Sequence, residues 1–261
     1  MNFLTTSPLW VSGLIFGVIL PALSMVGPFM VRRWVGLAWL QANNEVAGFK
    51  FAVVGVLYAV LLAFVVIVVW EKFSDAENTV AMEAGAVATV YRLSPGLGVT
   101  SASAVTKSMT DYLDAAIQYD WPAMAAGGED PTTNGALNAA YGVVLAGVPA
   151  DARASAALAA ILDQLDQITQ ARRARIVLAS GIVPDIVWLV LFAGAFVTVG
   201  FTYFFGAENL KAQTLMTGGL SLLIFAGLLI IIAIDHPFGG TVHVTSEPLG
   251  EVLLDFARVQ R

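Results

Sequence analysis

Three residues that could bind a metal follow the last long apolar run of the chain. Asp235, His236 and His243 lie within the stretch "IDHPFGGTVHV". Two imidazoles and one carboxylate form transition-metal sites when a fold brings them together. The sequence supplies the three side chains but no spacing that is typical of such a site. A metal site is therefore one of two interpretations of this stretch.

The second interpretation is structural, and we favour it. In the tail motif Asp235, His236, Pro237 and Phe238, the proline ends the apolar helix and the following glycines permit a turn. A carboxylate at a helix C-terminus is unfavourable beside the helix dipole, so we expect Asp235 to have a partner, most simply an arginine. Residues 241–245, "TVHVT", alternate as a short extended segment would. We expect an ordered tail that folds back on the preceding helices, with no metal and no cofactor.

Charged residues also occupy positions at which helix periodicity predicts buried aliphatic side chains. Before the third apolar run, an apolar seam with 4-3-4-3 spacing continues onto Arg172 and Arg175. After the second apolar run, a similar seam passes through Glu83. The arginine seam begins with Ala154, Leu158, Ile161, Leu165 and Ile168, and the glutamate seam contains Ala76, Val80, Val87 and Val90.

These three charges are expected to meet. The two helices leave and re-enter the same side of the apolar runs, and Glu83 and Arg172 lie at similar distances along them. An unpaired buried charge is costly, whereas a paired one is tolerated. We predict that Glu83 forms an ion pair with Arg172 or Arg175, within one chain or across a subunit boundary. In the alternative interpretation, all three side chains face water at the edges of their seams.

No residue pattern points to an enzyme. The chain has no cysteine, two histidines, no nucleophile beside a base and no phosphate-binding glycine loop. The net charge of −6 argues against nucleic acid as a partner. Of the 261 residues, 58% are hydrophobic and only 12% are charged, whereas soluble domains carry about 25% charged residues. The clustering of the apolar residues indicates a membrane protein that lies in a lipid bilayer.

Four apolar runs are long enough to cross a bilayer. Pro21 and Pro28 predict that the first is kinked or broken. No run carries a charge in its middle, which argues against a proton-coupled transporter. The expected spans cover residues 9–31, 51–70, 184–205 and 215–234.

A long alanine-rich insert separates the second and third spans. Turn residues divide it into expected helices near 75–93, 103–120, 135–146 and 151–180. The predicted fold class is an all-α integral membrane protein with four transmembrane helices and a helical extramembrane insert between helices 2 and 3. The expected parts are transmembrane helices 1 and 2 (1–70), the insert (71–183), transmembrane helices 3 and 4 (184–235) and an extramembrane tail (236–261).

Small residues lie on one face of the second span. Ala52, Gly55, Ala59 and Ala63 follow one another at helical spacing. Such a stripe lets helices approach closely, and this is the more frequent use in a protein with several spans. It also suits the wall of a pore, and a passive channel gated by an apolar constriction needs no charge in its spans. We retain these four residues as pore-lining candidates.

Three stretches of the chain resemble the bacterial bestrophin-like family, a family named as a domain of unknown function. They are "NNEVAGFKFAVVGVLYAVLLAFVV" (43–66), "VAMEAGAVATVYRL" (80–93) and "DHPFGGTVHVTSEPLGEVL" (235–253). The last is the most specific, and the resemblance covers about residues 40–255.

The resemblance implies a distant relative of bestrophins, which are pentameric anion channels lined by their second span. It also implies a bacterial inner membrane location with the insert in the cytoplasm, a side that the even distribution of Lys and Arg does not select. Two features depart from bestrophins. Only Asp235 lies where the calcium-binding members have a dense acidic cluster, so we expect no calcium site. Phe51, Tyr58 and Phe64 form no clustered aromatic gate in the second span.

Two functions are compatible with these observations. The leading hypothesis is a homo-oligomeric membrane channel that passes a small inorganic ion along an axis lined by the second span. The alternative is a non-conducting membrane scaffold or sensor whose helical insert binds a partner. A closed ring with an axial passage would support the channel, and a monomer or a lipid-plugged oligomer would support the scaffold.

Overall fold

The chain folds into two compact helical units. The computed structural model describes residues 9–240 and 242–259, which contain helices and no strand. Unit 1 combines the chain up to Glu71 with Ile182–Asp235, and unit 2 combines Lys72–Gly181 with the chain from His236 onward. The predicted all-α fold class is confirmed, because four helices are long and apolar enough to cross a membrane.

The first span is broken, as its two prolines predict. Its main break lies at Met25 and Val26, directly before Pro28 and the start of the last segment. A proline ring cannot follow a regular helical turn without displacing the preceding carbonyl, which explains this position. The segments are α2 (Leu9–Leu14), the π-helical turn η1 (Ile15–Ile19), α3 (Leu20–Ser24) and α4 (Gly27–Val35), followed by the short α5 (Leu37–Ala42).

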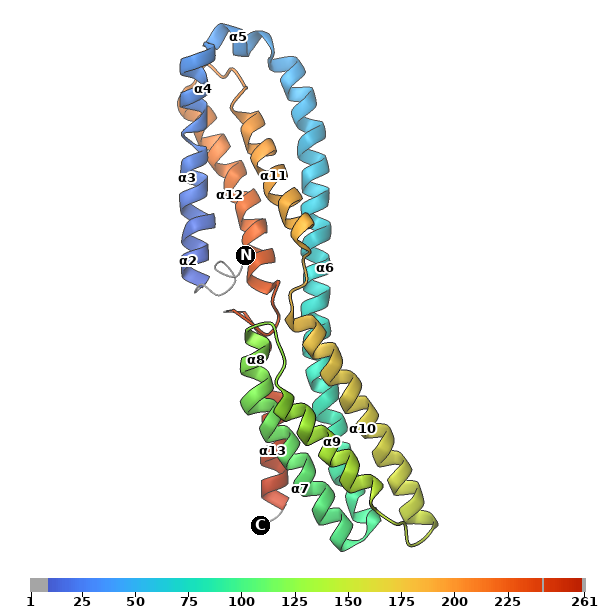
Figure 1. Cartoon of the computed structure of the whole chain (residues 1–261). Helices are drawn as coiled ribbons and strands as arrows, with labels where there is room; N and C mark the ends of the chain where they lie inside the picture. Colours follow the sequence, from blue (N-terminus) through green and yellow to red (C-terminus); the bar gives the residue numbers. More distant parts are fainter. Residues whose placement is uncertain (1–8, 241, 260–261) are drawn as a thin grey trace. The chain divides into compact units, whose positions relative to one another are not determined.

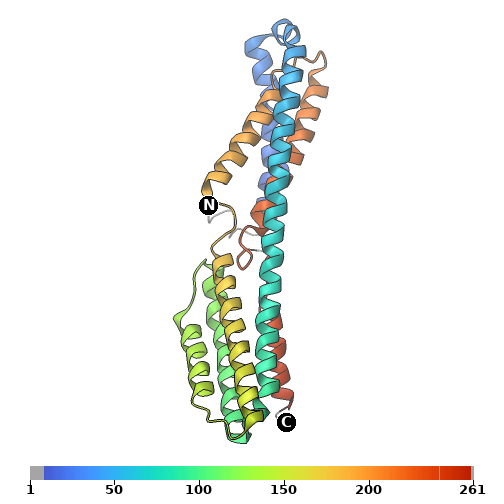
Figure 2. The same cartoon turned by 90° about the vertical axis from the view of Figure 1, so that its right-hand side faces the viewer.

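The second span and the first insert helix are one continuous helix, α6 (Asn44–Leu93). The helix expected near 75–93 is present as the continuation of the second span. No proline interrupts these 50 residues, so nothing breaks the hydrogen-bond ladder before the turn η2 (Ser94–Leu97). Figure 2 shows α6 as an uninterrupted helix.

The third and fourth spans of unit 1 are α11 (Asp185–Thr202) and α12 (Leu210–Ile234). Glycines let bulky side chains pack between these helices and α6. The ring of Tyr58 occupies the space beside Gly194, and its hydroxyl donates to the carbonyl of Leu191 at 3.1 Å. Leu62 packs in the same way beside Gly227. This hydrogen bond satisfies the buried hydroxyl of Tyr58, for which the hydrocarbon of a bilayer offers no hydrogen-bond partner.

Unit 2 holds the insert helices and the tail (Figure 1). Its core joins the end of α6 to apolar side chains from the other insert helices and from the tail helix. The insert boundaries fall at the turn segments that the sequence indicated. The helices are α7 (Val99–Ala115), the π-helical turn η3 (Ala116–Asp120), α8 (Trp121–Ala125), α9 (Pro131–Leu145) and α10 (Ala152–Ala179).

The tail is ordered and packs on the insert, as expected. Its helix α13 (Glu247–Val259) buries Leu249 and Phe256 in the core of unit 2, and Phe256 stacks on Tyr91 with ring centroids 4.2 Å apart. The expected extended segment before it is not a strand, since residues 242–246 have no regular structure. Thr241 lies outside the described residues. With no neighbouring strand to pair with, alternation alone does not produce a strand.

Candidate functional site

A network of buried charges lies at the centre of unit 2, and its main pair joins α10 to α6. The Nε of Arg175 donates to Oε2 of Glu83 at 2.9 Å, and Nη2 of Arg175 donates to Oε1 at 3.0 Å. Both side chains are completely buried. Two parallel bonds of this kind fix the orientation of both groups as well as their distance. This pair is one of the two alternatives that the seam spacing suggested.

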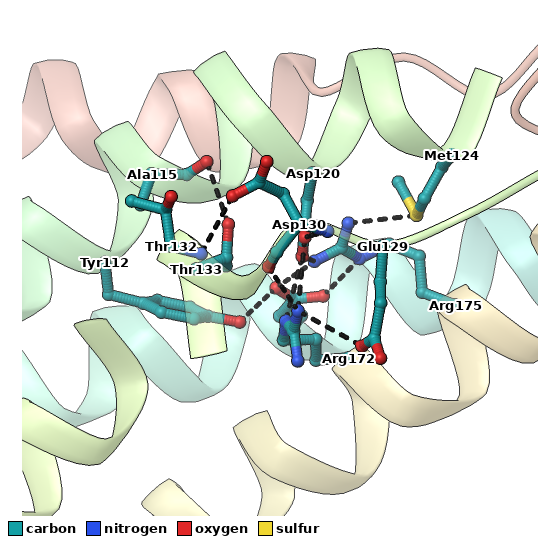
Figure 3. Close-up of polar contacts among 11 residues, drawn as sticks. Tyr112, Ala115, Asp120, Met124, Glu129, Asp130, Thr132, Thr133, Arg172 and Arg175 are labelled. Carbon is teal, nitrogen blue, oxygen red and sulfur yellow. Dashed lines mark hydrogen bonds and ion pairs between the residues drawn. The ribbon is translucent and has the colours of Figure 1, made fainter. Parts of the chain in front are cut away.

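Arg172 binds a different carboxylate. Its Nε donates to Oδ2 of Asp120 at 2.8 Å and its Nη2 donates to Oδ1 at 3.1 Å, so this pair is also bidentate. Asp120 is completely buried at the end of η3. Its Oδ2 lies 3.4 Å from Nη2 of Arg175, which joins the two pairs into one network (Figure 3).

The walls of the network come from α7 and α8. The hydroxyl of Tyr112 donates to Oε1 of Glu83 at 2.6 Å. The guanidinium of Arg175 lies 4.5 Å from the ring centroid of Trp121, a cation–π distance, and Nη1 donates to the sulfur of Met124 at 3.2 Å. These contacts place a sulfur acceptor and an aromatic face against the arginine, and a hydroxyl donor against its carboxylate partner, where water would otherwise solvate both groups.

The charges within the network balance. Two guanidinium groups face two carboxylates, all nearly or fully buried, and the Glu129 carboxylate lies 3.6 Å from Arg172 at the exposed edge. Burial alone would lower the pKa of Arg175, but Glu83, Tyr112 and Asp120 together outweigh it, and the pKa is raised. Burial first, and then Glu83, raise the pKa of Tyr112 well above its usual value. Arg175 therefore stays charged and Tyr112 stays protonated at neutral pH.

The loop before α9 closes the network. Asp130 caps α9 by accepting a hydrogen bond from the backbone N–H of Thr132 at 2.8 Å. Hydrogen bonding to Thr132, first through its side chain and then through its backbone, lowers the pKa of the Asp130 carboxyl. The backbone of the same residue serves the network, since its N–H donates to Oδ1 of Asp120 at 3.1 Å and its carbonyl accepts from Arg172 at 3.4 Å. The loop thus supplies the hydrogen bonds that the two ion pairs leave unmade.

Sequence reasoning missed Asp120 and Tyr112. An apolar seam, formed by Val105 and Met109 on α7 and Ala116 at the start of η3, passes through Tyr112, and its 4-3-4 spacing continues to Tyr119, one residue before Asp120. A charged residue on an apolar seam is the signal that identified Glu83. The π-helical turn η3 shifts the helix register over this interval, so strict α-helical spacing does not point to Asp120.

The tail motif has structural contacts. Oδ1 of Asp235 accepts hydrogen bonds from the backbone N–H groups of Ile182 and Val183 at 3.2 and 2.8 Å. Its partners thus include backbone amides ahead of α11, and the expected arginine partner stays a prediction. Amides at a chain turn provide a partial positive charge that serves the same purpose. Phe238 is buried with its ring edge-on to Trp121.

The two histidines differ in their surroundings. His236 is partly buried beside Gly181, whereas His243 is exposed. Among the described residues, no group of three or more His, Asp and Glu side chains could hold a metal ion.

Three of the four pore-lining candidates face a groove in unit 1. Ala52, Gly55 and Ala59 line an apolar hollow of about 420 Å³ together with side chains of α11 and α12, such as Thr198 and Leu220. Ala63 is exposed and lies outside this groove. The small-residue stripe thus borders the chain's own helices along part of its length.

Comparison with known proteins identifies relatives over most of the chain. The Bestrophin-like domain model matches residues 18–249. Crystal structures of singly substituted forms of a bacterial bestrophin homologue from Klebsiella pneumoniae have the same fold. Three of these are 16% identical to the chain, with TM-scores of 0.67, 0.68 and 0.69. The aligned regions include 92%, 94% and 95% of this chain and 97%, 99% and 98% of the respective homologue chains. No functionally curated protein matches.

Proposed function

Because the chain belongs to the Bestrophin-like domain family, we propose that it forms a homo-oligomeric membrane channel. In this proposal a small inorganic ion passes along a symmetry axis lined by α6. The chain is a multi-pass membrane protein with the bestrophin fold, and closed rings are the usual way in which identical subunits surround one axis. A pentamer and a cytoplasmic insert in the bacterial inner membrane are parts of the same proposal.

The observation that carries the proposal is the exposure of α6. Within its most apolar window only 11% of α6 is buried by the rest of the chain, whereas half of the corresponding window of α12 is buried. Bulky apolar side chains such as Val56, Leu57 and Phe64 are 63–66% exposed. A helix left this open contacts lipid, other copies of the chain or an axial passage. Of the four spans, α6 is the one best placed to contact other copies of the chain and to line an axial passage.

The native absence of cysteine makes a direct test possible. Single cysteines replace Ala52, Gly55, Ala59 or Ala63, and Leu57→Cys on another face of α6 serves as the matched control. Each variant is reconstituted into liposomes, and ion flux is measured before and after a charged thiol reagent. We expect flux in the parent protein and block of at least two stripe variants, with the control unaffected. Salts of different anions and cations then identify the permeant ion.

The main alternative gives a different result in the same experiment. A scaffold or sensor would form no ring, or a ring filled with lipid, and would give no flux in any salt. Native mass spectrometry of the detergent-solubilised protein measures the subunit number independently of conduction. An oligomer without flux would favour the scaffold, and flux that is blocked only through Leu57→Cys would place a different face of α6 on the axis.

A further inference from the structure

Figure 1 shows the end of unit 1 where α5 connects α4 to α6. Three exposed cations belong to the helix ends that meet there. Arg33 lies in the last turn of α4, Lys50 near the start of α6 and Lys211 in the first turn of α12. All three are exposed, and none has a hydrogen bond or ion pair to another residue in the described part of the chain. The carboxylates at this end are those of Glu45 and Glu208, so positive charge predominates.

The cations extend from connected backbone segments, which we call the platform: α5, the loop 203–209 and the adjoining ends of α4, α6 and α12. Asn44 binds both backbone groups of Gly206, accepting from its N–H at 2.7 Å and donating to its carbonyl at 3.1 Å. Arg32 donates to the carbonyl of Ala207 at 3.1 Å, which ties α4 to the same loop. A Cβ at position 206 would lie 2.5 Å from the backbone nitrogen of Gln41, so α5 and the loop are in direct backbone contact. These contacts therefore hold together the backbone segments from which the cations extend.

Aromatic and apolar side chains accompany the cations. Gly36, with a φ of 81°, turns the chain between α4 and α5. On either side of it Trp34 is 85% exposed and Trp39 is 56% exposed, and Phe29 and Met30 are also exposed. Tryptophan beside lysine and arginine at the end of a span is typical of the interface between hydrocarbon and headgroups.

We infer that this end of unit 1 binds the anionic headgroups of phospholipids. None of the three free cations lines either of two cavities of unit 1 that border α6 and α12. A bilayer presents many phosphate groups in one plane, which matches separate cations on separate helices. The long side chain of Lys50 reaches this plane from within the span. Lipid selectivity of this kind does not depend on whether α6 conducts ions.

Tryptophan quenching by brominated lipids tests the inference. The background carries Trp10→Phe and Trp70→Phe, because these two exposed residues would add their own signal. Trp34 and Trp39 then report on lipid at the platform. We compare brominated phosphatidylglycerol with brominated phosphatidylcholine at low and high salt. At low salt we expect a preference for phosphatidylglycerol of at least roughly fivefold, the value that one cation near an anionic surface supplies. High salt should reduce it.

Matched variants decide between the possible outcomes. The triple variant Arg33→Gln, Lys50→Gln, Lys211→Gln should lose the preference, whereas Arg92→Gln, Lys107→Gln, Arg153→Gln in the insert should keep it. Circular dichroism checks folding, and the single variant Lys50→Gln, with a partial loss, replaces the triple variant if that one unfolds. The inference is overturned if the parent shows no preference, if the triple variant keeps it, or if free inorganic phosphate abolishes it at equal ionic strength.

Discussion

The guanidinium of Arg175 binds the carboxylate of Glu83 through two hydrogen bonds of 2.9 and 3.0 Å, and neither side chain is exposed. The two residues are 92 positions apart in sequence. Their pairing holds α10 against the distal part of α6, the helix that also forms the second span. A buried pair of this kind does not by itself make a fold more stable, but breaking it leaves an uncompensated charge.

Charge reversal at Glu83 should disrupt unit 2. Glu83→Lys places a third cation beside Arg175 and Arg172, and we expect a loss of about 3–5 kcal/mol in the free energy of unfolding. Thermal and denaturant unfolding in detergent measure it. The double variant Glu83→Arg, Arg175→Glu should recover part of the loss, and Glu77→Lys on the exposed face of α6 should behave like the parent. Unchanged assembly and stability of Glu83→Lys would contradict this role.

Neighbouring arginines on α10 should differ sharply in importance. Arg172→Met removes both charged hydrogen bonds from the buried Asp120, and we expect a loss of about 3 kcal/mol. Arg173 is exposed and has no ion pair among the described residues, so Arg173→Met should change stability by less than about 0.5 kcal/mol. The same unfolding assay compares the two. Equal effects would show that Asp120 does not depend on Arg172.

Tyr112 should make stability depend on alkaline pH. Its pKa is raised in the folded chain, so the unfolded chain releases this proton first as the pH rises. The stabilising contribution is complete below about pH 10 and is lost above it, by up to about 1.4 kcal/mol for each pH unit. Unfolding between pH 9 and 11 should show a steeper decline for the parent than for Tyr112→Phe. The exposed Tyr119→Phe is the control and should decline as the parent does.

Two glycines should respond differently to alanine. In Gly206→Ala the new Cβ meets the backbone of Gln41, which cannot move without displacing α5, and we expect a loss of about 1–3 kcal/mol. Gly219 has no neighbouring atom within 4 Å of the same position, so Gly219→Ala in α12 should be neutral or slightly stabilising. Melting temperatures of the purified variants test both. A neutral Gly206→Ala would mean that α5 is not held against this loop.

The four spans and the existence of a buried charge can be predicted from the sequence alone. Apolar length dictates which segments lipid can accept, and that requirement acts on each segment separately. Helical periodicity identified Glu83, Arg172 and Arg175 for a similar reason, since a charge on an apolar seam is visible without knowledge of the partner. The break in the first span followed from Pro28, whose effect on the backbone is local.

Which charges meet depends on how the helices pack. Arg175 binds Glu83, and Arg172 binds Asp120 because the π-helical turn places Asp120 against α10. This arrangement cannot be derived from the local sequence. The same holds for Asp235, whose charge is met by the amides of Ile182 and Val183 from a distant part of the chain. A sequence pattern shows that a buried charged side chain requires a partner, whereas the packing of the helices determines which group is that partner.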